Sequence, residues 1–373
     1  MQRPNHGLED SQTLNVPKKR RGKNHDGARG PYRATTSTQF SPSDYTVGWI
    51  CALPLEMAAA KAMLDEVHAD LPKSLHDHNT YTLGQIGVHN VVIACLPSGV
   101  YGTTSAVRVA TLMLLSFQSI RLGLMVGIGG GAPSPRADIR LGDIVVSRPD
   151  ESFGGVVQYD YGKTIQEGRF RRIGTLNKPP HVLLTATSRL QADHISRPSR
   201  IPEYLSELAV NYPSMVPKFT YCGQRPDQLF DAHYEHLNSE DICEHCDSSR
   251  IVTRPTRPQN HPVIHYGLIA SGNQVMKHGK TRDRLARELG ILCFEMEAAG
   301  LMDLFPCLVI RGICDYADSH KNKQWQEYAA ATAAAYAKEL LYIISGDQVD
   351  ETQTAPEIPS IIGEYLITKV KLL

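Results

Sequence analysis

The sequence predicts an α/β domain with a central mixed, mainly parallel sheet flanked by helices on both faces. Short continuous apolar runs, such as residues 122–128 and 307–310, are typical of buried parallel strands. Alanine-rich stretches with helical spacing alternate with them, and the longest covers residues 325–344. This alternation along 373 residues favours an α/β fold over an all-α or all-β one.

Composition limits the class of protein. Hydrophobic residues make up 42% of the chain, which supports a globular core. The formal net charge is +0, so we expect no bulk attraction to nucleic acid. No apolar run is long enough for a membrane span, and no signal peptide opens the sequence. Eight cysteines in a chain of this length do not suggest a disulfide scaffold, so we expect a cytoplasmic setting, with a nuclear one open.

The distribution of residue types divides the chain into three predicted parts. Residues 1–43 carry few large apolar side chains, which predicts a disordered basic arm. Its compact basic run, residues 17–23, is either a nuclear-localisation or nucleic-acid patch or a solvated tail. Residues 44–345 form the predicted domain, with an irregular insertion at about 148–261 over the active-site face. Residues 346–373 form a linker and tail.

The domain begins with a predicted strand at residues 45–53 and a helix at residues 55–64. Pro54 marks the turn between them and places Glu56 where the strand passes into the helix. Ligands bind at the carboxyl ends of strands in open α/β sheets, so Glu56 is a candidate site residue. The alternative is an ordinary acid of the first helical turn.

Two glycine-rich segments follow further strands. Strands at residues 81–86 and 90–96 lead to the loop Ser98–Gly102, which contains Val100 and precedes a helix at residues 103–117. Backbone N–H groups at such a helix start can face a ligand.

The second glycine-rich segment, residues 127–132, follows the strand at 122–128. Its glycines let the backbone approach a ligand closely. Pro133 and Pro135 forbid a helix directly after it, so it does not match a dinucleotide-binding fingerprint. The next predicted strand covers residues 141–146.

The insertion holds two predicted helices, at residues 182–190 and 202–211, and a Cys-x-x-Cys pair. Such a pair can provide half of a zinc site, and the alternative is free thiols in a loop. The pair and its potential co-ligands are Cys243, Cys246, Cys222, His233 and His236.

The most informative stretch covers residues 293–318. A strand at 263–270 and a helix at 282–289 precede it. Within the stretch a strand ends near Phe294, a helix runs toward Pro306, and a second strand, with its apolar run at 307–310, delivers Asp315 just past its carboxyl end.

Two carboxylates are therefore expected at one edge of the sheet. Ionised Glu297 can accept hydrogen bonds from a pair of hydroxyls. Asp315 can act as a general acid if its site raises its pKa. The alternatives are a helix N-terminal acid for Glu297 and a solvated cap for Asp315.

Phe-Glu-Met-Glu-Ala followed by Arg-Gly-Ile-Cys-Asp-Tyr-Ala-Asp resembles the purine nucleoside phosphorylase and methylthioadenosine/S-adenosylhomocysteine nucleosidase superfamily. The resemblance covers about residues 45–345 and is greatest to the fungal form of the domain. It implies the nucleoside phosphorylase fold, a homodimer or higher homo-oligomer, a role in purine salvage, and no metal or organic cofactor.

The resemblance also implies residue roles. Asp315 would protonate purine N7, Glu56 would orient the attacking water, and Glu297 would hold the ribose hydroxyls. Val275 stands where nucleosidases carry an aromatic residue, and Asn273 where they carry an aspartate. The other positions implied to bind substrate are Met296, Gly129, Gly130, Val275, Met276, Val100 and Arg311.

The loop after the first strand distinguishes two chemistries. Phosphorylases carry a basic residue for phosphate there, whereas this chain has Glu56 and no arginine. A carboxylate would repel phosphate and could polarise water. We therefore expect a hydrolase acting on an adenosine-, inosine- or guanosine-type nucleoside. The alternatives are a methylthioadenosine/S-adenosylhomocysteine nucleosidase, a phosphorolytic enzyme, and a nucleoside-sensing module without turnover.

Overall fold

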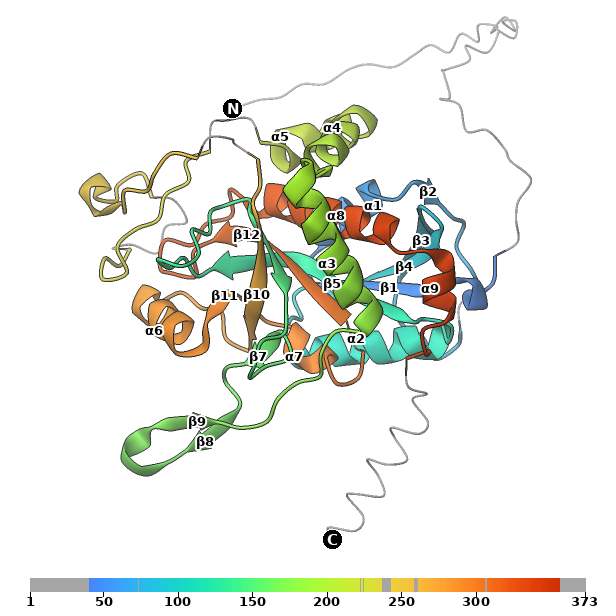
Figure 1. The fold of residues 1–373 in the computed structure, drawn as a ribbon, viewed down its shortest axis with the longest axis horizontal. Coiled ribbons are helices and arrows are strands. Elements are labelled where there is room, and N and C mark those ends of the chain that lie inside the picture. The colour runs from blue at the N-terminus through green and yellow to red at the C-terminus, as the bar shows by residue number, and fades with distance from the viewer. Residues whose placement is uncertain are drawn as a thin grey trace, which may run out of the picture. The chain divides into compact units, whose positions relative to one another are not determined.

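The computed structural model describes residues 40–355 except residues 73, 222, 224, 237–242, 258–260 and 306 (Figure 1). All described residues belong to the compact unit that starts at Phe40. The basic run at 17–23, Cys222, Pro306 and the tail beyond residue 355 lie outside the described residues. Phe40 stacks on His68 at a ring distance of 4.0 Å, so the domain includes residues that the sequence assigns to the arm.

The described residues form a mixed sheet in the order β11-β10-β6-β12-β5-β1-β4-β3-β2, with β7 beside β10. Strands β4, β1, β5 and β12 run parallel, as predicted, and β12 pairs with β6 in the antiparallel sense. The strands of this sheet are β1 (Val47–Cys51), β2 (Glu66–Val67), β3 (Tyr81–Ile86), β4 (His89–Cys95), β5 (Leu122–Gly131), β6 (Ile144–Ser147), β7 (Val156–Gln158), β10 (Ile264–Ser271), β11 (Ile291–Glu295) and β12 (Cys307–Asp315).

Helices cover both faces of this sheet (Figure 1). Residues Val47, Trp49 and Cys51 of β1 pack toward α1, α3, α4 and α8, whereas Ile50 packs toward α2 and α7. The alternation follows from the period of two along a strand. The helices are α1 (Pro54–Ala62), α2 (Thr103–Ser116), α3 (His181–Ser196), α4 (Ile201–Asn211), α5 (Val216–Phe219), α6 (Gly279–Leu289), α7 (Ala298–Leu301), α8 (Gln326–Ile343) and α9 (Gly346–Asp350).

Helix α8 fixes the position of β12. A Cβ atom on Gly312 would lie 1.8 Å from the carbonyl oxygen of Ala329, so the strand and the helix backbones pack directly against each other. Alanines along α8 allow this approach because their side chains are small. The end of β12, which carries Asp315, is therefore held in a fixed position relative to α8.

Two strands are longer than the sequence indicates. β5 continues through the glycine-rich segment to Gly131 because β11 pairs with Gly130 and Gly131 in the antiparallel sense. This pairing joins the ends of β5 and β11. β12 continues past the apolar run at 307–310 to Asp315, through the charged residue Arg311.

The described parts of the insertion and of the tail contain more regular structure than predicted. Residues 148–261 contain α3, α4 and α5, which all pack beside α8, and a hairpin of β8 (Gly162–Thr164) and β9 (Phe170–Arg172) that projects from the sheet (Figure 1). After α9, Ala355 N donates to Ile120 O at 3.0 Å. In the part of the chain that the structure describes, no helix is long and apolar enough to cross a bilayer.

Candidate active site

A cavity of about 590 Å³ opens at the carboxyl ends of β1, β5, β11 and β12. This volume falls in the range of ordinary ligand pockets. Most of the predicted site residues line the cavity: Asp315, Glu56, Glu297, Met296, Gly129, Gly130, Val275 and Met276. Val100 and Arg311 do not line it, and Tyr101 does in place of Val100. None of the described residues of the insertion at 148–261 lines the cavity.

Glu56 is buried and held by backbone donors. Ala52 N and Leu53 N donate to its Oε2 at 2.7 and 2.9 Å, and Ile128 N donates to its Oε1 at 2.8 Å. Glu56 thus caps its own helix, as the alternative interpretation expects. A carboxylate can accept about four hydrogen bonds, so these contacts leave one site on Oε1 for a further donor. Burial raises the pKa of Glu56, although the Arg311 charge and these N–H groups favour its ionised form.

Arg311 is buried behind the acids that line the cavity and contacts them on the side away from the cavity. Its side chain is 0% exposed, and its Nη2 donates to Glu295 and lies 3.7 Å from Oε2 of Glu297. A Cβ atom on Gly127 would lie 2.4 Å from Glu56 and 2.6 Å from Nη1 of Arg311, so glycine is needed there. Arg311 therefore does not reach the cavity, as a contact with substrate would require, and contacts the carboxylates instead.

Glu295 is a site residue to which the sequence analysis assigned no role. Its carboxylate accepts hydrogen bonds from Glu297 N and Ala298 N at 3.0 Å and pairs with Arg311. It therefore positions the backbone of Glu297. Glu295 and Glu297 are separated by one residue, and such spacing next to a strand end is a signal that both face the same way.

Glu297 lines the cavity with a buried carboxylate. Its Oε1 accepts a hydrogen bond from Gly102 N at 3.3 Å, and its side chain is buried. Burial and the neighbouring Glu295 carboxylate raise the pKa of Glu297 to about 7, although Arg311 opposes this shift. Near neutral pH the group therefore exists in both protonation states.

The surroundings of Asp315 favour its ionised form. Lys321 Nζ lies 2.8 Å from its Oδ2, and Ala317 N donates to its Oδ1 at 2.9 Å. Burial alone would raise the pKa of Asp315, but the Lys321 ammonium and these donors hold it below its usual value. The expectation that the site raises this pKa is wrong, because Lys321 folds back onto Asp315, a contact that no sequence pattern indicates.

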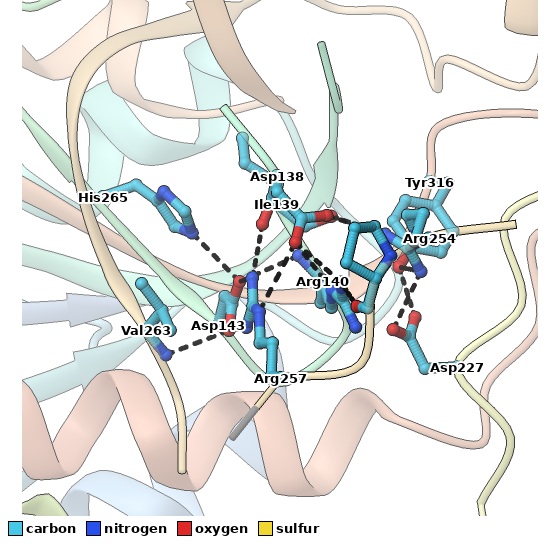
Figure 2. A network of polar contacts seen from close by, with 11 residues as sticks. Asp138, Ile139, Arg140, Asp143, Asp227, Arg254, Arg257, Val263, His265 and Tyr316 are labelled. Atoms are coloured by element: carbon cyan, nitrogen blue, oxygen red, sulfur yellow. Dashed lines mark hydrogen bonds and ion pairs between the residues drawn. The ribbon is translucent and has the colours of Figure 1, made fainter. Parts of the chain in front are cut away.

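A polar network fixes the loop that follows Asp315 (Figure 2). Arg254 Nη2 donates to Tyr316 Oη at 2.7 Å and pairs with Asp227 at 2.8 Å, and Tyr316 donates to Asp227. Asp143, in the Gly-Asp-Ile-Val-Val segment, binds Arg257 at 2.6 Å. Insertion residues thus secure the active-site loop from outside the cavity.

The loop at 98–102, together with the start of α2, meets the loop at 271–276, which contains Asn273 and Val275, at the cavity rim. Asn273 Oδ1 accepts hydrogen bonds from Thr103 N and Thr103 Oγ1, both at 3.1 Å. The position that carries an aspartate in nucleosidases thus joins the loop at 271–276 to the start of α2. Met276 is buried beside the cavity, whereas Val275 is half exposed.

Comparisons with known proteins show the family of the chain and its fold. The profile of the phosphorylase superfamily matches residues 46–345. A nucleotide-binding leucine-rich repeat (NLR)-like protein of Hyaloscypha variabilis is 50% identical over 84% of this chain. The chain spans only 30% of the length of that relative.

A 5'-methylthioadenosine/S-adenosylhomocysteine nucleosidase of Mycobacterium bovis is 27% identical over 80% of this chain and 96% of its own length. Among solved structures, the nucleosidase of that name from Helicobacter pylori matches with a TM-score of 0.52 at 16% identity. The match covers 80% of this chain and 99% of that one, and it concerns the fold.

Proposed function

The chain belongs to the phosphorylase superfamily, and we propose that it hydrolyses the N-glycosidic bond of a purine nucleoside of the adenosine, inosine or guanosine type. The observation that carries the proposal is the gathering of Glu56, Glu297 and Asp315 around one cavity of suitable size. The contacts of each acid suit it to a different component of the reaction: water for Glu56, the ribose for Glu297 and the purine for Asp315.

The nucleophile is water rather than phosphate. The backbone N–H groups around Glu56 leave one acceptor site, which suits a water molecule. A phosphate ion beside this carboxylate would be repelled. The lysines that line the cavity are Lys321 and Lys323, and Lys321 already pairs with Asp315. Glu56 would orient the water and receive its proton, as the base of an inverting glycosidase does.

The ribose binds at Glu297. An ionised carboxylate accepts hydrogen bonds from both neighbouring hydroxyls of the sugar, and Arg311 and Glu295 hold it in place from below. Met296 lines the same part of the cavity and supplies an apolar contact. Positive charge that develops on the ribose during cleavage would be stabilised by these carboxylates.

The purine leaves toward Asp315. Asp315 and Lys321 share one transferable proton, which rests on the lysine. Purine N7 becomes more basic as the C–N bond breaks, and Asp315 relays the proton to it. The products are the free base and free ribose. The homo-oligomer and the intracellular location stay predictions.

A 5′-methylthio nucleoside is the second candidate substrate, because a relative that aligns over 96% of its own length carries the name of such a nucleosidase. A panel of nucleosides that includes methylthioadenosine decides between the two. A nucleoside-sensing module would bind a member of the panel without releasing its base.

In phosphate-free buffer the purified protein should release adenine, hypoxanthine or guanine together with free ribose. Chromatography of the base and a reducing-sugar assay measure both products. Glu56→Gln should slow this turnover, because the water loses its base. Activity that requires added phosphate and yields ribose 1-phosphate would show a phosphorylase instead.

The value of kcat/KM should rise with pH through about 7, because Glu297 titrates near that pH in the free protein and must be ionised to accept both hydroxyls. Glu297→Gln should lower kcat/KM and remove this rise, the acidic limb of the pH profile. Glu203→Gln, on the exposed surface of α4, is the matched control and should leave the limb unchanged. A limb that survives in Glu297→Gln would contradict this assignment.

The same shift predicts a trend in stability. The pKa of Glu297 in the folded protein lies above its ordinary value of 4.5. Protonated Glu297 therefore contributes to the free energy of unfolding below pH 4.5, and this contribution is lost as the pH rises to about 7. Glu297→Gln should flatten this part of the stability profile.

A further inference from the structure

A cluster of sulfur and nitrogen atoms lies outside the active-site cavity. One candidate ligand atom from each of His236, Cys243 and Cys246 lies within 4.8 Å of the others. Bond lengths of about 2.3 Å to sulfur and 2.0–2.1 Å to nitrogen place the ligands of a tetrahedral zinc ion roughly 3.3–3.8 Å apart. Small shifts of the side chains are therefore sufficient to bind one ion.

His320 provides the second observation. The residue is 7% exposed, and neither of its ring nitrogens has a hydrogen-bond partner among the described residues. Buried polar atoms normally have such a partner. The ring centroid of His320 lies 5.4 Å from that of His236, and its carbonyl oxygen accepts a hydrogen bond from Cys243 Sγ at 3.8 Å. His320 lies beside the cluster but outside the three-residue group, and its Nδ1 lies 3.9 Å from Oδ1 of Asp318. A turn of its ring toward an ion in the cluster would give the imidazole its missing partner.

We propose that His236, Cys243 and Cys246 bind a structural zinc ion, with His320 as the fourth ligand. Two thiolates and two imidazoles form a common zinc set, whereas magnesium and calcium prefer oxygen ligands. Zinc has no redox chemistry, and four protein ligands leave no open position for a substrate. The ion therefore has a structural role.

The position of the cluster indicates what the ion would hold together. His236 N donates to Ser319 Oγ at 2.9 Å, and the ring of His320 stacks on Phe230 at 4.0 Å. These contacts join the insertion to the loop between Asp315 and Lys321. Metal coordination would make this junction rigid, because it replaces weak contacts by metal–ligand bonds.

Elemental analysis of the full chain, purified under reducing conditions without chelator, should find about one zinc ion per chain. Cys246→Ser and His236→Ala should each lose the metal and lower the melting temperature. His245→Ala is the matched control: its side chain is an exposed potential ligand in the same loop, outside the cluster. That variant should keep its zinc. Cobalt substitution of the wild type should give the absorption of a tetrahedral thiolate site.

Wild-type protein that is free of zinc, takes up none from an added zinc salt and melts at the same temperature with and without it would overturn the proposal. A disulfide between Cys243 and Cys246 that persists under the reducing purification would do so as well. If Cys246→Ser does not fold, zinc competition between the wild-type protein and a chromophoric chelator still measures the site. Failure to retain zinc against a weak chelator then counts against it. None of these outcomes depends on nucleosidase activity.

Discussion

Asp315→Asn should reduce turnover by about 10²–10⁴-fold, the usual worth of general acid catalysis. The amide keeps the shape of the side chain and can still accept the hydrogen bond from Ala317 N. It cannot relay a proton to N7, so the purine would have to depart unprotonated, and it is a poorer leaving group in that form. Substrate affinity should change little, because the ribose binds at Glu297. Rates of base release and calorimetric binding measure the two effects separately.

The double variant Asp315→Asn/Lys321→Met is the control for charge. Asp315→Asn leaves the Lys321 ammonium without its carboxylate partner, and that alone could distort the site. If proton transfer is what matters, the double variant should be as slow as the single one. Recovery of activity in the double variant would show that the unpaired lysine, and not the lost proton, caused the defect.

The sequence predicted the sheet and most of its helices because these depend on local periodicity. It did not predict the length of β5, since Gly130 and Gly131 have no strand preference of their own and their pairing with β11 is a long-range contact. The end of β12 was missed for a related reason. Arg311 interrupts an apolar run, and only the acids of neighbouring elements allow a charge to be buried there.

The acids of the site were found from their places at strand ends, but their electrostatics were not. The pKa of Asp315 depends on Lys321, which is six residues away in a polar stretch without periodicity. The turn between them contains Ala317 at a φ of 51°, which sequence patterns do not indicate for an alanine. Likewise, whether Val100 or Tyr101 faces the cavity depends on the conformation of a glycine-flanked loop.

Arg311→Met should lower the free energy of unfolding by about 3–5 kcal/mol, the range for breaking a buried ion pair from one side. Methionine fills much of the same space, so the loss comes from charge. Without the guanidinium, Glu295 keeps a carboxylate whose side chain is 1% exposed, and the buried acids Glu297 and Glu56 lose the positive charge that opposes their repulsion. Urea denaturation at pH 7 measures the change.

Arg311→Met/Glu295→Gln tests whether the cost is electrostatic. The amide removes the negative charge left by the single substitution and can still accept hydrogen bonds from Glu297 N and Ala298 N. The double variant should therefore recover part of the lost stability, since replacing both members of a buried pair costs less than removing one. A single variant whose stability falls by no more than about 0.5 kcal/mol, the range of ordinary surface substitutions, would contradict this role of Arg311. So would a double variant less stable than the single one, because the carboxylate would then contribute stability without its partner.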